Sequence, residues 1–202
     1  PMWTNARPEL LQDLCQKLVA ADAKASGQDD QTFLVLGVSG QGGVGKSVLM
    51  AMACHDDRVQ SAFPDGIFWC KVGRLAGKGE APEKVAAMLR QTWVPTMDKD
   101  ASEKWNQWLE ELNATAVDKS TAVLNRLLPQ RRCLLVLDDV WSFDAARSVL
   151  RAANNHRCVV ALSTRQGDVL KKNMDYLSED ACIPVDRLLP GEALAFLKHR
   201  LE

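Results

Sequence analysis

One short segment limits the possible folds of this chain more than any other part of the sequence. It reads Gly40-Gln41-Gly42-Gly43-Val44-Gly45-Lys46-Ser47 and satisfies the pattern G-x-x-x-x-G-K-[ST]. An apolar run typical of a buried strand, residues 33–38, precedes it, and a helical periodicity follows it. Glycines in such a turn let successive amide groups face an anion, and the following helix adds its positive end. The segment therefore predicts a phosphate-binding loop in an α/β domain.

Further apolar runs of strand length follow this loop, and helical patterns separate them. These runs cover residues 67–72, 133–137, 158–162 and 181–185. They lack the polar alternation of a strand with one wet face, which indicates strands buried on both sides of a parallel sheet. We predict a three-layer α/β fold with a five-stranded, mostly parallel sheet flanked by helices.

Hydrophobic periodicity also places the helices. Pro8 suits a first helical turn, and the leucines after it predict a helix over residues 8–25. Further helices are expected around residues 48–53, 85–89, 105–112 and 117–128. The polar stretch 95–104 is expected to be a loop inside the second-to-third strand connection. The tryptophans around it, Trp93, Trp105 and Trp108, are interpreted as packing anchors.

Composition excludes several functional classes. The 25 basic and 26 acidic residues give a formal charge of −1, so the chain has no overall attraction for nucleic acid or anionic membranes. No apolar run approaches the ~18 residues that span a bilayer, and we expect a cytoplasmic protein. The six cysteines and three histidines show no zinc-type spacing, which favours buried thiols and helix-end or surface histidines.

The domain assignment has two parts. Residues 1–30 are expected to form an N-terminal linker and helix, and residues 31–202 the P-loop nucleotide-binding domain. A helical pattern runs from Glu192 to Glu202 without a cap, so we expect a fragment of a longer protein, truncated at its C-terminus.

The loop residues have distinct expected roles. Gly42 to Ser47 should form the phosphate cradle. Lys46 can reach the β- and γ-phosphates as a point charge, and the Ser47 hydroxyl can take one place on an octahedral Mg²⁺.

Two strand ends supply further candidates. Asp138 and Asp139 follow the apolar run 134–137, where Asp138 would hold Mg²⁺ in the Walker B role and Asp139 would activate water. The same pair could instead cap a helix that begins near Trp141. Arg165 follows the next run and could meet a γ-phosphate, although alone it is as compatible with a surface ion pair.

Five segments in a fixed order carry a family resemblance. They are GVSGQGGVGKSVLM, FPDGIFWCKVG, CLLVLDDVW, ALSTR and LLPGEALAFL. From about residue 3 to its end, the chain resembles the NB-ARC (AP-ATPase) class of STAND P-loop ATPases. These are ASCE-type nucleotide switches found in plant disease-resistance proteins, the animal apoptosome scaffold and bacterial regulators.

The resemblance implies ATP or ADP as ligand, with Mg²⁺. It assigns Asp138 to the metal, Asp139 as base and Arg165 as γ-phosphate sensor, and it places the Arg165 strand between the P-loop strand and the Asp138 strand. It implies adenine contacts from the segment before the first helix, at Arg7 and Pro8. The implied nucleotide-binding residues in the loop are Gly42, Gly43, Val44, Gly45, Lys46, Ser47 and Val48.

The implied function is a signalling switch that hydrolyses ATP slowly. Partners would be the absent ARC subdomains, effector and sensor domains, and a homo-oligomer on activation, with innate immunity or apoptosis-like signalling as a family-level expectation. One alternative is a nucleotide-gated scaffold with negligible hydrolysis, because Asp139 stands where many ASCE ATPases carry a longer glutamate. A less favoured alternative is a conventional GTPase or kinase, although the sequence has no N-K-x-D motif and no arginine-rich lid.

Overall fold

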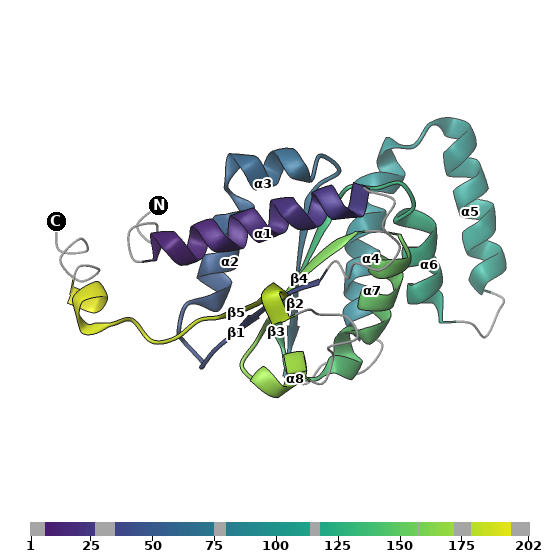
Figure 1. The fold of residues 1–202 in the computed structure, drawn as a ribbon. Helices are drawn as coiled ribbons and strands as arrows, with labels where there is room; N and C mark the ends of the chain where they lie inside the picture. Colours follow the sequence, from purple (N-terminus) through teal and green to yellow (C-terminus); the bar gives the residue numbers. More distant parts are fainter. Residues whose placement is uncertain are drawn as a thin grey trace.

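The computed structural model describes residues 7–26, 35–74, 80–113, 118–156, 158–171 and 179–194. Strands and helices alternate along these residues (Figure 1). The elements are α1 (Pro8–Ser26), β1 (Val35–Ser39), α2 (Lys46–Cys54), α3 (Asp57–Ala62), β2 (Ile67–Gly73), α4 (Glu80–Trp93), the 3-10 helix η1 (Val94–Thr96), α5 (Lys99–Asn113), α6 (Lys119–Leu127), β3 (Leu134–Val140), α7 (Phe143–Asn155), β4 (Val159–Thr164), α8 (Gly167–Lys171), the 3-10 helix η2 (Glu179–Ala181) and β5 (Cys182–Pro184).

The sheet is parallel and has the strand order β2-β3-β4-β1-β5. Its central strands are buried on both faces, as their unbroken apolar runs predict. One core lies between the sheet and α1, α2 and α3, and a second lies between the sheet and α4, α6 and α7 (Figure 1). The prediction of a three-layer α/β fold with a five-stranded sheet is confirmed.

Strand order determines where the site forms. β4 lies between β1 and β3, as the family resemblance implies. The carboxyl ends of β1, β3 and β4 therefore meet at one edge of the sheet. This edge carries the glycine-rich loop after β1, the acidic pair at the end of β3 and Arg165 after β4.

The expected loop over residues 95–104 is wrong. Only η1 and the two residues after it interrupt the helices, and α5 begins at Lys99. The Asp98 side chain accepts a hydrogen bond from the Ala101 amide at 2.8 Å, an N-cap that allows a helix with a polar first turn. Trp93 and Trp105 are buried, which confirms their role as packing anchors.

All six cysteines lie in the described part of the chain and none is in a disulfide; four are buried, and Cys54 and Cys182 are half-buried. Burial raises the pKa of Cys15 and of Cys54 to about 11, so both are protonated at neutral pH. His55 and His156 end α2 and α7, as expected for helix-end histidines.

The part of the chain that the structure describes lacks two features, a membrane-spanning helix and a cluster of metal-binding side chains. None of its helices is long and apolar enough to cross a membrane. It also contains no group of three or more acidic, cysteine or histidine side chains placed to hold a metal ion. Three sequence expectations, the domain boundary at residues 30 and 31, the helix start at Val117 and the helix over 195–202, lie outside the described ranges.

Candidate functional site

The glycine-rich loop joins β1 to α2. Gly43 and Gly45 have φ values of 78° and 100°, a region that glycine occupies without steric cost. Gly45 is also the N-cap residue of α2, so the loop closes directly onto a helix N-terminus. Open amide groups and a helix dipole meet there, which favours an anion.

Lys46, the first residue of α2, is almost fully buried. Its Nζ donates hydrogen bonds to the carbonyl oxygens of Gly40 and Gln41, both at 2.8 Å. Burial lowers the Lys46 pKa, the nearby Arg165 charge lowers it further, and Asp139 and Asp138 oppose the shift. A phosphate anion beside the amine would favour its charged form.

A buried carboxylate connects the loop helix to two strands. Asp138 Oδ1 accepts hydrogen bonds from Ser47 Oγ at 2.7 Å and from Ser163 Oγ at 2.5 Å. Asp138 is only 6% exposed, so the two hydroxyls replace the solvent that a charged group would otherwise need. The structure thus brings together Ser47 and Asp138, the two predicted metal ligands.

Asp139 occupies an irregularity in the sheet. The β3–β4 register shifts between Leu137 and Val140, and Asp139 has a φ of 58°. Its amide donates a hydrogen bond to Ser163 Oγ at 2.9 Å. A bulge of this kind re-aims a side chain, and here the Asp139 carboxylate accepts a hydrogen bond from Arg165 Nε at 3.1 Å.

The alternative that the acidic pair caps the next helix is wrong. The N-cap residue of α7 is Ser142, whose side chain accepts a hydrogen bond from the Ala145 amide. Both aspartates lie within β3, before that helix begins. Their side chains therefore belong to the sheet edge.

These groups surround a cavity of about 250 Å³ at the edge of the sheet. Its lining residues are Gly43, Gly45, Lys46, Ser47, Val48, Lys71, Asp138, Asp139, Ser163 and Arg165. Sequence reasoning assigned no role to Lys71 or Ser163. Ser163 stood in the quoted ALSTR segment, but only the pairing of β3 with β4 brings it to both aspartates.

Gly42 does not line this cavity, but it lies next to Arg165, which does. A Cβ atom at Gly42 would lie 2.9 Å from Arg165 Nη1, so the sensor candidate approaches the loop backbone closely. The five residues expected to act on phosphates and metal, Lys46, Ser47, Asp138, Asp139 and Arg165, share the one cavity.

A second, apolar cavity of about 50 Å³ lies beside the loop. Its lining residues are Arg7, Val44, Gly45, Val48, Leu49, Met52, Val185 and Leu188. Val44 and Val48, two of the predicted nucleotide contacts, thus face Arg7 across it. Apolar walls next to a phosphate cradle suit a flat heterocyclic base.

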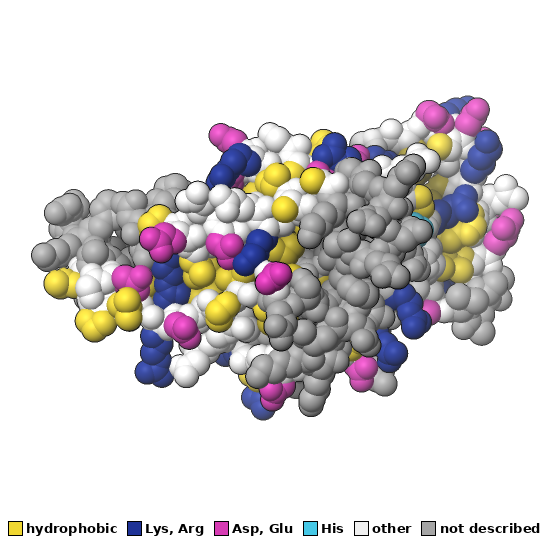
Figure 2. Space-filling model, viewed as in Figure 1, with side chains coloured by type: hydrophobic (Ala, Val, Ile, Leu, Met, Phe, Trp, Pro, Cys, Tyr) yellow, Lys and Arg dark blue, Asp and Glu magenta, His cyan; other side chains and the backbone are white. Residues whose placement is uncertain are grey.

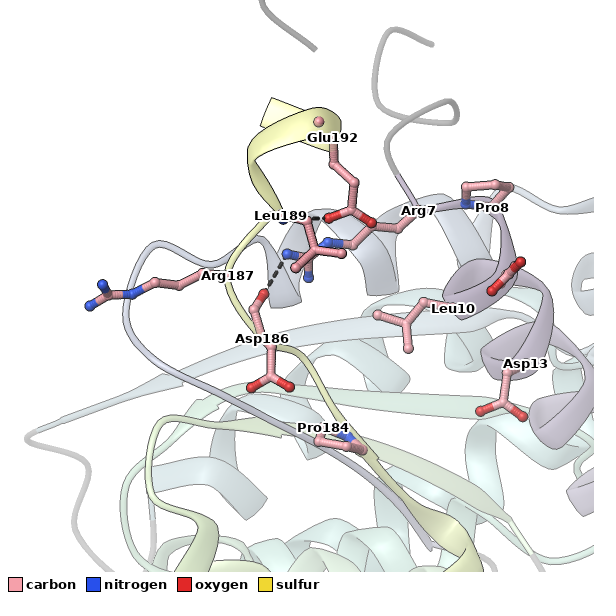
Figure 3. Close-up of a pocket in the computed structure, with 11 residues that line it drawn as sticks. Arg7, Pro8, Leu10, Asp13, Pro184, Asp186, Arg187, Leu189 and Glu192 are labelled. Carbon is pink, nitrogen blue, oxygen red and sulfur yellow. Dashed lines mark hydrogen bonds between the residues drawn. The ribbon is translucent and has the colours of Figure 1, made fainter. Parts of the chain in front are cut away.

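Pro8 lines a different pocket, an open one of about 900 Å³ between the start of α1 and the segment after β5 (Figure 3). Arg7 lines both pockets, and its Nη2 donates a hydrogen bond to the Asp186 carbonyl oxygen. The structure therefore places Arg7, but not Pro8, beside the apolar cavity.

The segment after β5 is also tied to the phosphate loop. The Val185 amide donates to the Ser39 carbonyl oxygen at 2.7 Å, and Arg187 donates twice to the Gln41 side chain, at 3.0 and 2.8 Å. A Cβ atom on Gly40 would lie 2.2 Å from the Val185 carbonyl oxygen, so only glycine permits this approach.

The surface has no dominant charge on the face shown in Figure 2. Acidic and basic side chains are interspersed over its described part (Figure 2). Two large hydrophobic side chains, Leu189 and Leu194, are 66% and 54% exposed in the segment after β5. The mixture of acidic and basic side chains on this face agrees with the near-zero formal charge.

Several known proteins are similar to this chain. It is 30% identical over 134 residues to apoptotic protease-activating factor 1 of Danio rerio, covering 63% of this chain and 9% of that protein. It is 24% identical over 191 residues to the regulatory protein AfsR of Streptomyces coelicolor, covering 95% and 17%. A probable disease resistance protein of Arabidopsis thaliana is 26% identical over 162 residues, covering 79% and 16%. The chain thus spans less than a fifth of each relative.

One solved structure, C. elegans PCH-2, matches with a TM-score of 0.49 and 11% identity, covering 99% of this chain and 49% of that chain. The sequence profile of the NB-ARC domain matches residues 9–200, nearly the whole chain. The glycine-rich loop, the acidic pair and all five strands of the sheet lie within the matched residues. The chain therefore belongs to the NB-ARC domain family of nucleotide-binding modules.

Proposed function

We propose that this domain binds ATP and ADP with Mg²⁺ and hydrolyses ATP slowly, as the nucleotide switch of a longer signalling protein. The observation that carries the proposal is the shared phosphate cavity. It joins a buried lysine, a hydroxyl–carboxylate pair and an arginine at one sheet edge. The relatives, named for apoptotic activation, regulation and disease resistance, support a signalling context.

The donor set at this edge fits Mg²⁺, which prefers hard oxygen ligands. The Ser47 hydroxyl donates a hydrogen bond to Asp138, so the lone pairs of the serine oxygen remain available to a cation. When bound, Mg²⁺ would neutralise charge on the β- and γ-phosphate oxygens. Ser47 and Asp138 are the proposed holders of the ion.

Asp139 is the proposed general base, and its present partner limits that role. Arg165 Nε donates to Asp139 Oδ1 at 3.1 Å, so this carboxylate oxygen is already engaged and does not face an attacking water alone. A γ-phosphate that attracts Arg165 would free the carboxylate for the attacking water. Hydrolysis would then depend on whether Arg165 pairs with the γ-phosphate or with the Asp139 carboxylate.

The same ion pair favours a second candidate function, a nucleotide-gated scaffold with negligible hydrolysis. If Arg165 stays on Asp139 when ATP is bound, no base is free. The γ-phosphate would still distinguish the ATP state from the ADP state through Lys46 and Arg165. The two candidates differ only in turnover.

Binding and turnover measured together test both candidates. We expect Mg²⁺-dependent binding of ATP and ADP in preference to GTP, with slow phosphate release. Asp139→Asn should keep the ATP Kd within about threefold and slow phosphate release by about 100-fold, because an amide cannot take a proton from water while its oxygen can still accept the hydrogen bond from Arg165. The charge-matched control Asp100→Asn, in α5, should change neither.

Three other outcomes would each change one part of this proposal. Release from the parent protein above the rate of a sample without protein, and unchanged in Asp139→Asn, would contradict the assignment of Asp139 as general base. Release from the parent protein no faster than from a sample without protein would favour the scaffold. Preferential binding of GTP would overturn the choice of adenine as the nucleobase.

The remaining elements of the proposal concern the full-length protein. We place ARC, effector and sensor domains beyond this domain, residues 31–202, with residues 1–30 as its N-terminal linker and helix. Exposed Leu189 and Leu194 are compatible with a neighbouring subdomain covering the segment after β5. We also propose a cytoplasmic location and homo-oligomer formation in the ATP state.

A further inference from the structure

An aromatic ring beside the phosphate cavity carries two guanidinium groups. Arg165 Cζ lies 5.3 Å from the centroid of the Trp141 ring, and Arg74 Cζ lies 5.2 Å from the same centroid. Both distances are within the ~6 Å range of a cation–π contact. Trp141 lies between the last residue of β3 and Ser142, the N-cap residue of α7, so its backbone is fixed on both sides.

The indole N–H does not explain the position of this tryptophan. Trp141 Nε1 is buried, and it has no hydrogen-bond partner in the described part of the chain. A buried donor without an acceptor disfavours the folded state. The contacts that can offset this unfavourable free energy are those between the Trp141 ring face and the two guanidinium groups.

Arg165 is held from two sides. Its Nε donates to Asp139, its Cζ lies over the Trp141 ring, and its Nη1 lies next to Gly42 of the phosphate loop. The Arg165 side chain is 46% exposed, so without these contacts it would sample many rotamers. The two contacts leave the Nη end of the guanidinium facing the loop.

We propose that Trp141 is a positioning residue, which holds the Arg165 guanidinium over the phosphate loop so that it meets a γ-phosphate with little loss of side-chain freedom. The inference rests on the proposed function, because it assigns Arg165 to the γ-phosphate. ADP has no such phosphate. Trp141 should therefore favour ATP over ADP, by about fivefold for one exposed cation–π contact.

Three variants measure this preference as the ratio of the ADP Kd to the ATP Kd. Trp141→Ala should lower the ratio by about fivefold through weaker ATP binding, with ADP binding unchanged. Trp141→Phe keeps an aromatic face and should restore most of the ratio. Arg74→Ala removes the other cation from the ring without altering Arg165, and it should leave the ratio within about twofold.

Several outcomes would overturn the inference. One is an unchanged ratio in Trp141→Ala, and another is a parallel loss of ATP and ADP binding, which a merely structural role would produce. A third is a loss in Trp141→Phe as large as that in Trp141→Ala. A loss in Arg74→Ala of the same size would also overturn it, because the effect would then not act through Arg165.

A spectroscopic measurement without nucleotide separates this inference from the proposed function. The emission of Trp141 is obtained as the difference between the parent protein and Trp141→Phe. We expect Arg165→Met to change this emission in nucleotide-free protein, because the cation leaves the ring. Unchanged emission would overturn the positioning role. A parent protein that binds neither nucleotide but shows the change would instead contradict the proposed function alone.

Discussion

The two halves of the candidate site are built differently. The phosphate half is a cavity of about 250 Å³ lined by charged and hydroxyl groups from α2, β2, β3, β4 and the residue after β4. The base half is an apolar cavity of only about 50 Å³, closed by Arg7 and by the segment after the edge strand β5. The proposed phosphate site is therefore preformed, whereas the proposed site for the nucleobase would have to widen to admit one.

This difference suggests a division of labour. Anchoring energy should come from the preformed half, where the binding groups are already ordered. Selectivity for the nucleobase should depend on how readily Arg7, Val185 and Leu188 move, because these three residues line the small cavity.

The largest expected effect is in the phosphate half. Lys46→Ala should weaken ATP, ADP and inorganic tripolyphosphate alike by at least about 100-fold, because it removes the charged donor to the phosphates. Isothermal titration calorimetry measures all three. The exposed control Lys84→Ala, in α4, should bind as the parent does. ATP binding that survives Lys46→Ala would show that the phosphate-loop assignment is wrong.

The next effect concerns the junction of the halves. Gly40→Ala places a methyl group 2.2 Å from the Val185 carbonyl oxygen, and backbone must shift. The free energy of unfolding should fall by about 2 kcal/mol. Gly73→Ala is the control, since Gly73 has a φ of 83° but open space around its Cβ position. Chemical denaturation that gives equal losses for both variants would rule out the Val185 contact as the cause.

The third prediction isolates the base half. Met52 lines the apolar cavity, and Met52→Asn should weaken ATP and ADP about tenfold by adding a polar group without a partner. Tripolyphosphate has no base, so its Kd should stay unchanged in the same titrations. Met52→Leu keeps the apolar wall and serves as control. An equal loss for tripolyphosphate would mean that the halves are not separable.

The smallest effect tests the link between the halves. Arg187→Ala removes two hydrogen bonds to Gln41, at 3.0 and 2.8 Å, and should weaken ATP about threefold. A double-mutant cycle with Gln41→Ala measures the coupling. Additive losses would show that these exposed bonds do not steady the phosphate loop.

Much of the phosphate half could be predicted from the sequence, because its parts are local. A glycine-rich turn before a helix and carboxylates after an apolar run each combine residues adjacent in the chain. The five strands were predictable for the same reason. The sheet order came only with the family resemblance, since apolar runs carry no information about which strands pair.

What the sequence did not predict arises from contacts between distant segments. Ser163 bonds to Asp138 and Asp139 only because β4 pairs with β3, and a serine has no distinctive pattern of its own. The left-handed φ of Asp139 follows from a register shift that alternation cannot reveal. In α5 a local signal did exist, the Asp98 cap, but the polar first turn concealed it.

The hydrogen bond from Val185 to Ser39 has a mechanical consequence. Tension on the segment after β5 would enter the backbone at this bond, one residue before the phosphate loop begins at Gly40. A displacement of this segment would therefore act directly on the backbone that leads into the proposed phosphate loop.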